Sequence, residues 1–218
     1  MKVGVIDIGK NVSAIVIDGL YTDEELEGMW TEIEFLEPKL GDENKTQAAV
    51  DPTPYGEKRK KRGRGVFLDE VYTDRRFSTI LTTTRKLFFH PEIKTAVEGI
   101  ISFNQDSLYW KNWERINHDS TLLQCYDSGD YYDFHADHAL FTAITIHRSY
   151  AAKPILGGDL VIKSPDGVEY IHQPKDNSTI IFPSILEHKV TKVAYKDPLT
   201  PSSVSNYRWS VSHLISVR

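Results

Sequence analysis

Eight short β-rich segments follow one another between residues 121 and 215, with turn signals between them and no helical pattern among them. β-Branched and aromatic residues are frequent in these segments, and Gly, Pro, Asn or Asp residues separate them. The predicted strands are Leu122–Tyr126, Tyr131–Asp137, Leu140–Ile146, Asp159–Ile162, Glu169–His172, Thr179–Phe182, His188–Val193 and Tyr207–Ile215. This pattern is typical of a jelly roll, or double-stranded β-helix, so we predict a mainly β fold with flanking helices.

The first part of the chain, to about residue 117, has mainly helical periodicity. Thr22 and Glu25 have the spacing of a capping box, which starts a helix that ends before Pro38. The other expected elements are a strand at Val12–Ile17, helices at Arg75–Phe88 and Glu92–Phe103, and a long polar loop over 39–65. We expect one domain over residues 1–218, in which residues 1–117 support a jelly-roll core of residues 118–218.

The composition excludes several classes of protein. The 218-residue chain is 40% hydrophobic and 26% charged, which suffices for a folded core. Its net charge of -5 argues against a general nucleic-acid binder. The single Cys125 excludes an internal disulfide framework and fits the reducing cytoplasm. We expect no membrane partner and no signal peptide, because no apolar run is long enough and Met1–Gly19 lacks a continuous apolar segment.

Two histidines and an aspartate form a candidate metal site. His135 and Asp137 are two residues apart, so their side chains would share one face of a strand. His188 begins a later predicted strand, which a jelly roll can bring beside the first pair. Two histidines and one carboxylate are the facial triad of non-heme Fe(II) oxygenases, although zinc can use the same ligands.

Arg208 and Ser210 form a candidate site for a carboxylate. They also lie two residues apart in a predicted strand, and the apolar and aromatic residues around them indicate that this strand is buried. A buried Arg needs an anionic partner, and its planar guanidinium matches a carboxylate. A cosubstrate with a carboxylate group would meet that need.

A series of motifs occurs in order along residues 121–218. They are Tyr126-x-x-Gly129-x-x-Tyr132-x-x-His135-x-Asp137, Gly157-Gly158-Asp-Leu-Val-Ile162, Phe182-Pro183, His188-x-Val-x-x-Val193 and Arg208-x-Ser210. Together they resemble the 2-oxoglutarate- and Fe(II)-dependent dioxygenases, and within them the prolyl 4-hydroxylase type with its small bacterial and viral members. Val16–Gly19, ahead of the capped helix, is similar to the entry into that fold.

The resemblance implies a cofactor set and a role for each motif. Fe(II) would be held by His135, Asp137 and His188. The distal carboxylate of 2-oxoglutarate would bind Arg208, with Ser210 beside it. O2 is the further cosubstrate, and dependence on ascorbate is common in the family.

Two tyrosines match family positions near the reactants. Tyr126 resembles the tyrosine whose phenol reaches 2-oxoglutarate, and its alternative role is that of an aromatic residue of the core. Tyr132 matches a tyrosine near the substrate. Strict alternation along a strand would put Tyr132 on the face opposite His135, unless the backbone bends between them.

The spacing before Arg208 departs from the family, because it follows His188 by twenty residues and residues 196–206 look like an insertion. Insertions in surface loops cost little stability, so we expect the strand to return to the site. Lys192 or Lys196 is the alternative cation for the cosubstrate.

The run Lys58–Arg64 is the strongest cluster of charge in the chain. Most such runs are solvated loops, and the alternative is a lid or docking strip for an acidic peptide or nucleic acid. This run lies far from every metal motif in the sequence, so we predict that it is dispensable for 2-oxoglutarate turnover in the absence of substrate but matters for substrate capture.

The predicted activity is hydroxylation of a C–H bond, coupled to decarboxylation of 2-oxoglutarate to succinate. The resemblance favours a prolyl residue of a peptide or protein, or a related amino acid, while the residues themselves leave other small molecules open. One alternative is a non-catalytic metal-binding jelly-roll module. Another is a nucleic-acid demethylase of the same superfamily, which usually carries a second Arg where this chain has Leu214.

Overall fold

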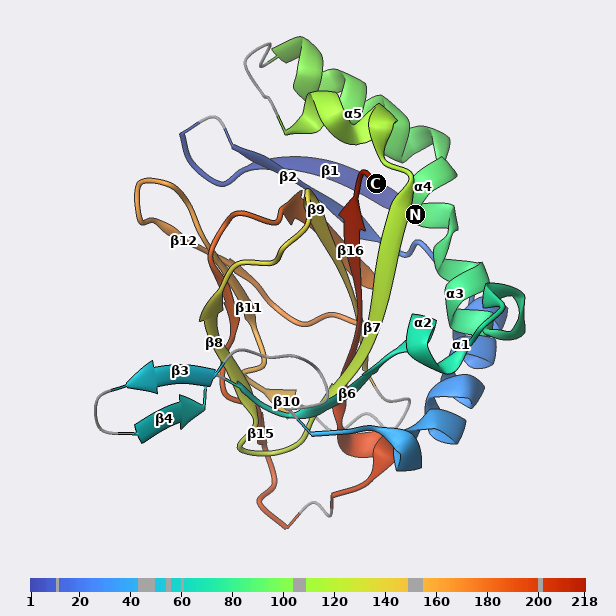
Figure 1. Cartoon of the computed structure of the whole chain (residues 1–218), viewed down its shortest axis with the longest axis vertical. Helices are drawn as coiled ribbons and strands as arrows, with labels where there is room; N and C mark the ends of the chain where they lie inside the picture. Colours follow the sequence, from blue (N-terminus) through green and yellow to red (C-terminus); the bar gives the residue numbers. More distant parts are fainter. Residues whose placement is uncertain are drawn as a thin grey trace.

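The computed structural model describes residues 1–10, 12–42, 50–53, 56–59, 61–103, 109–148, 155–199 and 202–218, and of residues 50–53 and 56–59 it describes the backbone. Two antiparallel sheets and a layer of helices build the molecule (Figure 1). The predicted mainly β fold with flanking helices is confirmed, and the two sheets form its jelly roll.

The larger sheet has seven strands in the order β1-β2-β13-β9-β16-β7-β6. Their bounds are β1 Lys2–Asp7, β2 Ser13–Asp18, β6 Arg64–Phe67, β7 His118–Tyr126, β9 Phe141–Arg148, β13 Ser178–Pro183 and β16 Arg208–Ser216. The smaller sheet has five strands in the order β12-β11-β14-β8-β5. Their bounds are β5 Lys61–Arg62, β8 Tyr131–His135, β11 Leu160–Lys163, β12 Glu169–His172 and β14 His188–Val190. Two further pairs are β3 Val50–Thr53 with β4 Gly56–Arg59, and β10 Ile155–Leu156 with β15 Ala194–Tyr195.

Helices cover the outer face of the larger sheet (Figure 1). The α-helices are α1 Asp23–Leu36, α2 Leu68–Val71, α3 Thr79–Thr84, α4 Lys86–Phe89 and α5 Pro91–Phe103, and the 3-10 helices are η1 Glu37–Lys39, η2 Arg75–Phe77, η3 Trp110–Arg115 and η4 Val204–Asn206. The predicted capping box starts α1, since the Thr22 hydroxyl accepts the Glu25 amide and the Glu25 carboxylate accepts the Thr22 amide. In the described part of the chain, no helix is long and apolar enough to cross a bilayer.

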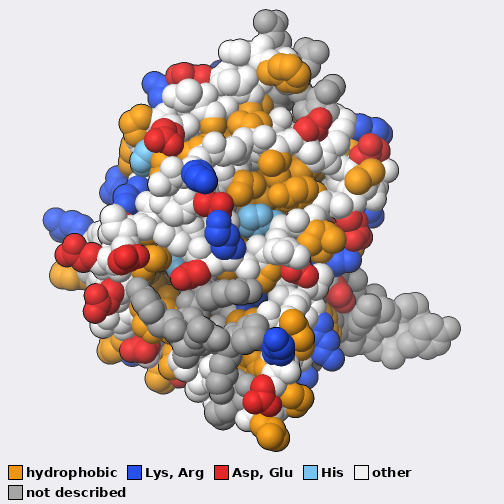
Figure 2. Space-filling model, turned by 180° about the vertical axis from the view of Figure 1, so that it is seen from behind, with side chains coloured by type: hydrophobic (Ala, Val, Ile, Leu, Met, Phe, Trp, Pro, Cys, Tyr) orange, Lys and Arg blue, Asp and Glu red, His pale blue; other side chains and the backbone are white. Residues whose placement is uncertain are grey.

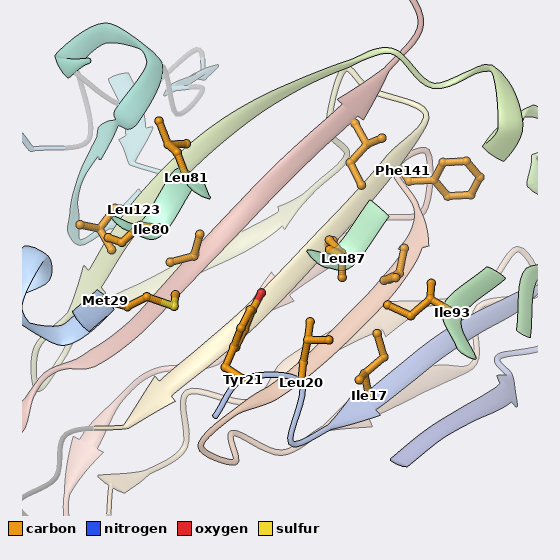
Figure 3. Close-up of a cluster of buried hydrophobic side chains, with 14 of the residues drawn as sticks. Ile17, Leu20, Tyr21, Met29, Ile80, Leu81, Leu87, Ile93, Leu123 and Phe141 are labelled. Atoms are coloured by element: carbon orange, nitrogen blue, oxygen red, sulfur yellow. The ribbon is translucent and has the colours of Figure 1, made fainter. Parts of the chain in front are cut away.

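The main hydrophobic core lies between the helices and the larger sheet (Figure 3). Met29 of α1 and Ile80 of α3 are fully buried beside Leu123 of β7 in this cluster. A second cluster lies between the sheets, where Ile180 of β13 meets Leu160 of β11. Burial of these side chains removes apolar area from water on both faces of the larger sheet, which fixes its position between helices and smaller sheet.

Strand alternation gives the larger sheet one apolar and one polar face at β7 and β16. Trp209, Val211 and Ile215 of β16 pack in the core with the helices. Arg208 and Ser210 point to the other face, toward the smaller sheet, where they line a cavity. Because successive side chains of a strand point to opposite faces, the polar residues Arg208 and Ser210 lie in the space between the two sheets.

All eight strands predicted after residue 121 are present, with ends that differ by a few residues. β8 ends at His135, so Asp137 lies in the following loop and not in the strand as predicted. The helix predicted at Arg75–Phe88 is broken into η2, α3 and α4. Ser78 caps the second piece through its hydroxyl, and the β-branched residues of Thr82–Thr84 weaken helix propensity before the break.

The first 117 residues contribute more strands than their periodicity indicated. β1, β2 and β6 belong to the larger sheet and β5 belongs to the smaller one. The predicted long loop over 39–65 is therefore wrong where β3 to β6 lie, and residues 43–49, 54–55 and 60 lie outside the described residues. β5 and β6 are edge strands, and edge strands commonly carry charged residues that hide their pattern.

Candidate active site

His135, Asp137 and His188 come together on the smaller sheet. His188 of β14 pairs directly with His135 of β8, and Asp137 follows β8 by two residues. The Nε2 atom of His135 lies 3.8 Å from one Asp137 carboxylate oxygen, and that of His188 lies 3.4 Å from the other. One ligand atom from each residue lies within 4.8 Å of the others, so the three could hold one metal ion.

The two imidazoles are oriented by backbone carbonyls. The Nδ1 atom of His135 lies 2.9 Å from the Asp133 oxygen, and that of His188 lies 3.0 Å from the Leu186 oxygen. A protonated Nδ1 that donates to a carbonyl leaves the Nε2 lone pair available for a metal. Burial, and then the neighbouring His188, lower the pKa of His135 to about 4, which keeps this ring neutral as a metal ligand must be.

The Asp137 carboxylate is held by the loop and by the larger sheet. Its backbone amide donates to the Ser184 carbonyl at 3.1 Å. The Thr142 hydroxyl of β9 donates to a carboxylate oxygen at 2.6 Å and also contacts the Ser184 hydroxyl at 2.8 Å. These contacts fix a residue that lies outside any strand, so the carboxylate still meets both imidazoles.

Arg208 is 1% exposed, and its guanidinium is only half satisfied. Its Nε donates to the Gly158 carbonyl at 2.7 Å, and its Cζ lies 5.3 Å from the centre of the Tyr126 ring. Both terminal nitrogens are buried and have no partner among the described residues. Burial lowers the pKa of Arg208, but a guanidinium stays charged, so an anion is needed to complete this environment.

The backbone of the Gly157-Gly158 motif packs directly against the Arg208 side chain and the Lys192 backbone. Both glycines have positive φ, +68° and +70°. A Cβ on Gly158 would lie 2.7 Å from the Arg208 Cδ, and one on Gly157 would lie 2.2 Å from the Lys192 carbonyl oxygen. Only glycine combines this backbone conformation with so close an approach.

One cavity of about 250 Å³ connects the metal triad with Arg208. Its walls include the predicted site residues His135, Asp137, His188, Arg208, Ser210, Tyr126 and Tyr132. Tyr132 shares the face of His135 because the pairing of β8 with β14 shifts register between them, so strict alternation is wrong here. Neither Lys192 nor Lys196 is among the described residues that line the cavity.

Comparisons with known proteins find similar folds among solved structures. No protein-family model and no curated protein sequence matches the chain. A prolyl-4-hydroxylase from Pseudomonas putida is similar in structure with a TM-score of 0.56 at 13% identity, covering 94% of this chain and 92% of that one. A prolyl hydroxylase from Trichoplax adhaerens, in complex with a peptide fragment of the hypoxia inducible factor oxygen degradation domain, gives 0.57 at 11% identity, covering 93% and 83%. An oxidoreductase of the 2OG-Fe(II) oxygenase family from Burkholderia pseudomallei gives 0.51 at 12% identity, covering 93% and 84%.

The fold is that of the prolyl hydroxylases. Within this prolyl hydroxylase fold, the triad lies on the smaller sheet and Arg208 on the larger one.

Lys61 is a residue of this cavity that the sequence did not single out. It is 1% exposed, pairs in the backbone with Tyr132, and places its Nζ 5.3 Å from the Tyr132 ring centre. The run Lys58–Arg64 lies far from the metal motifs in the sequence, but its Lys61 lines the same cavity as they do. The run is divided, because Arg62 pairs with Asp130 at 3.0 Å and Arg64 with Glu37 at 2.8 Å, while Lys60 lies outside the described residues.

The described residues of the insertion over 196–206, and Tyr195 just before it, are held by hydrogen bonds to the turn between β7 and β8. The Asp127 carboxylate, in the turn between β7 and β8, accepts the hydroxyls of Tyr195 and Ser202, each at 2.5 Å. Tyr195 also packs beside the buried cluster that contains Tyr126 and Val193. The chain then enters η4 and β16, so the added residues leave Arg208 in register with Tyr126 of β7.

Proposed function

We propose that this protein is an Fe(II)- and 2-oxoglutarate-dependent dioxygenase that hydroxylates a C–H bond. One observation carries the proposal: three metal-ligand side chains and a buried guanidinium with two unpartnered nitrogens face the same cavity of about 250 Å³. A metal centre and a carboxylate receptor in one cavity fit a keto acid that chelates the metal at one end and carries a carboxylate at the other.

The metal in this proposal is held by His135, Asp137 and His188. When bound, Fe(II) with O2 and 2-oxoglutarate supplies the oxidation that yields the hydroxylated substrate, succinate and CO2. The protein contributes two imidazoles oriented by backbone carbonyls and a carboxylate held by Thr142, a set of three ligands that would leave room for the cosubstrates.

The cosubstrate in this proposal binds along the face of the larger sheet. Arg208 receives the distal carboxylate through its two unpartnered nitrogens, and Ser210 lies on the same face two residues on. Tyr126, whose ring lies beside the guanidinium, completes the pocket. Charge supports this placement, because the carboxylate removes the cost of a buried, uncompensated cation.

The substrate we propose is a prolyl residue of a peptide or protein, or a related amino acid. Structures with this fold include prolyl hydroxylases, and the one from Trichoplax adhaerens is in complex with a peptide fragment. We further propose one domain over residues 1–218, since both sheets draw strands from before and after residue 118. A cytoplasmic location and use of ascorbate complete the proposal, and the buried free Cys125 fits a reducing compartment.

Two alternatives receive less support. A structural zinc site would normally take four protein ligands, and the described residues at this site offer three. A nucleic-acid demethylase would need a basic surface for the phosphate backbone. In Figure 2 the acidic and basic side chains of the described residues are interspersed over the visible face.

The experiment that tests this function is a screen by mass. Purified protein is given Fe(II), 2-oxoglutarate, ascorbate and O2, with proline-containing peptides, free amino acids and oligonucleotides as candidates. The proposal expects one class to gain the mass of one oxygen atom, and expects no gain with Asp137→Ala. Demethylation of an oligonucleotide, or an equal gain with the variant, would contradict it.

A further inference from the structure

Strand β16 runs along the wall of the cavity from the carboxylate receptor to the metal end. Arg208, Ser210 and Ser212 follow one another at intervals of two residues, so their side chains share the face that lines the cavity. Leu214 continues this row and pairs in the backbone with Thr142 of β9, whose hydroxyl donates to the carboxylate of the metal triad. The row therefore leads from Arg208 toward the metal ligands.

Gln124 of β7 lies beside the middle of this row. Its backbone pairs with Ser210 on one side and with Gly65 of β6 on the other. Gly65 has no side chain, so the Gln124 side chain has no neighbour on that strand at this level. Gln124 is 6% exposed and lines the cavity. Glutamine is mostly found at the surface, and a buried polar side chain needs hydrogen-bond partners.

One hydrogen bond sets the direction of the Gln124 carboxamide. The Ser212 hydroxyl donates to its oxygen at 3.3 Å. Because Ser212 lies two residues beyond Ser210, this bond draws the carboxamide away from Arg208 and toward the metal end of the row. The nitrogen carries two N–H groups, and no described residue accepts a hydrogen bond from them. A ligand that offers an oxygen atom at this point would supply the missing acceptor.

The cosubstrate offers such an oxygen, if the proposed function holds. A keto acid that chelates a metal uses its keto oxygen and one carboxylate oxygen, which leaves the second oxygen of that carboxylate free to accept hydrogen bonds. Arg208 and Ser210 serve the other carboxylate, at the distal end. A neutral amide suits the chelating carboxylate, because the metal already offsets its charge and a hydrogen bond to a charged oxygen is a strong one.

We propose that the Gln124 amide donates a hydrogen bond to the carboxylate of 2-oxoglutarate that chelates the metal. This inference rests on the proposed function and adds a residue that holds the keto-acid end of the cosubstrate, as Arg208 holds the distal end. With both ends held, the cosubstrate keeps one orientation at the metal.

Two keto acids of the same length test which end Gln124 holds. 2-Oxopentanoate has the keto-acid end of 2-oxoglutarate and a methyl group in place of the distal carboxylate. The protein is loaded with Fe(II) in the absence of O2, so that no turnover occurs. Chelation of Fe(II) by a keto acid gives a visible absorption band, and titration of this band gives the Kd of each keto acid for the wild type and for each variant.

The expected result separates Gln124 from Arg208. Gln124→Met keeps the length of the side chain and loses the amide, so the Kd should rise by about tenfold for both keto acids, the size of one hydrogen bond to a charged group. Arg208→Ala should raise the Kd of 2-oxoglutarate and leave that of 2-oxopentanoate nearly unchanged. Gln173→Met is the matched control, because Gln173 is exposed and is not among the described residues that line the cavity.

Wild-type Kd values for both keto acids in Gln124→Met would overturn the inference. A loss confined to 2-oxoglutarate would also overturn it, because Gln124 would then serve the distal carboxylate. So would a loss of Fe(II) affinity before any keto acid is added, since this would assign Gln124 to the support of the metal ligands. Failure of the proposed function gives a different result, in which the wild type itself binds no Fe(II) or shows no band with 2-oxoglutarate.

Discussion

The Tyr132 ring stacks on the His135 imidazole, with ring centres 3.6 Å apart and planes inclined by 13°. The two residues are three apart in β8, a spacing that strict alternation assigns to opposite faces. The register shift between β8 and β14 brings them to one face, since His188 pairs with His135 and Val190 with Tyr132. Tyr132 covers one face of the imidazole while the Asp133 carbonyl contacts its Nδ1 edge, so the two together limit the rotation of a metal-ligand candidate.

Removal of this stack should weaken the metal site. Tyr132→Ala is expected to lower Mn(II) affinity by about tenfold, the scale of contacts that orient a ligand. Tyr132→Phe keeps the ring and should bind Mn(II) like the wild type. Calorimetric titration of both variants checks this, and equal affinities in Tyr132→Ala and the wild type would show that the stack does not orient His135.

Arg208 should control affinity for 2-oxoglutarate and leave metal binding intact. Arg208→Ala removes two charge-assisted hydrogen bonds of about 1.5 kcal/mol or more each, so the Kd for 2-oxoglutarate should rise by about 100-fold or more. Arg208→Lys should recover part of this, because it keeps charge and loses the planar fork. Ser210→Ala removes one bond worth about 1 kcal/mol, or about a factor of five. Normal binding by Arg208→Ala, with loss in Lys192→Ala, would mean that the cation has been misassigned.

Gly158 should matter through its contact with Arg208. In Gly158→Ala the new Cβ would lie 2.7 Å from the Arg208 Cδ and displace the guanidinium. We expect the Kd for 2-oxoglutarate to rise by about tenfold, since small displacements of binding groups are costly. Gly167→Ala is the control, because Gly167 also has positive φ, +86°, but has nothing within 4 Å of its Cβ position. Similar loss of Tm in both variants with a change in Kd in only the first would confirm the contact.

His147 should make the fold sensitive to acid. Burial lowers the pKa of His147 to about 4 from its ordinary value of 6.5, and its Nε2 has no partner among the described residues. The unfolded chain takes up a proton before the native state does, so stability is complete above pH 6.5 and falls as the pH drops toward 4. Between pH 7 and pH 5 this group should cost about 2 kcal/mol. Urea unfolding of the wild type and His147→Gln at both pH values measures the difference, and parallel losses in the two proteins would exclude His147 as its source.

Much of the site could be predicted because it follows strand alternation. His188 and the pair Arg208 and Ser210 lie where a period of two places them. Lys61 could not be predicted, since neighbouring lysines and arginines have the same chemistry and only the register of β5 on β8 buries Lys61 while it leaves Arg62 exposed. The sequence left the orientation of Tyr132 open, because a register shift depends on the partner strand and leaves no mark in the local pattern.

The formation of succinate from 2-oxoglutarate tests the central claim most directly, because it requires the metal triad and Arg208 to act as one site. Wild-type protein and Asp137→Ala are each supplied with Fe(II), 2-oxoglutarate and O2 in the absence of any substrate, and succinate is measured over time. The account predicts slow formation of succinate by the wild type that requires Fe(II), and none above background with Asp137→Ala. Succinate at the wild-type rate from Asp137→Ala, or no Fe(II)-dependent succinate from the wild type, would contradict it.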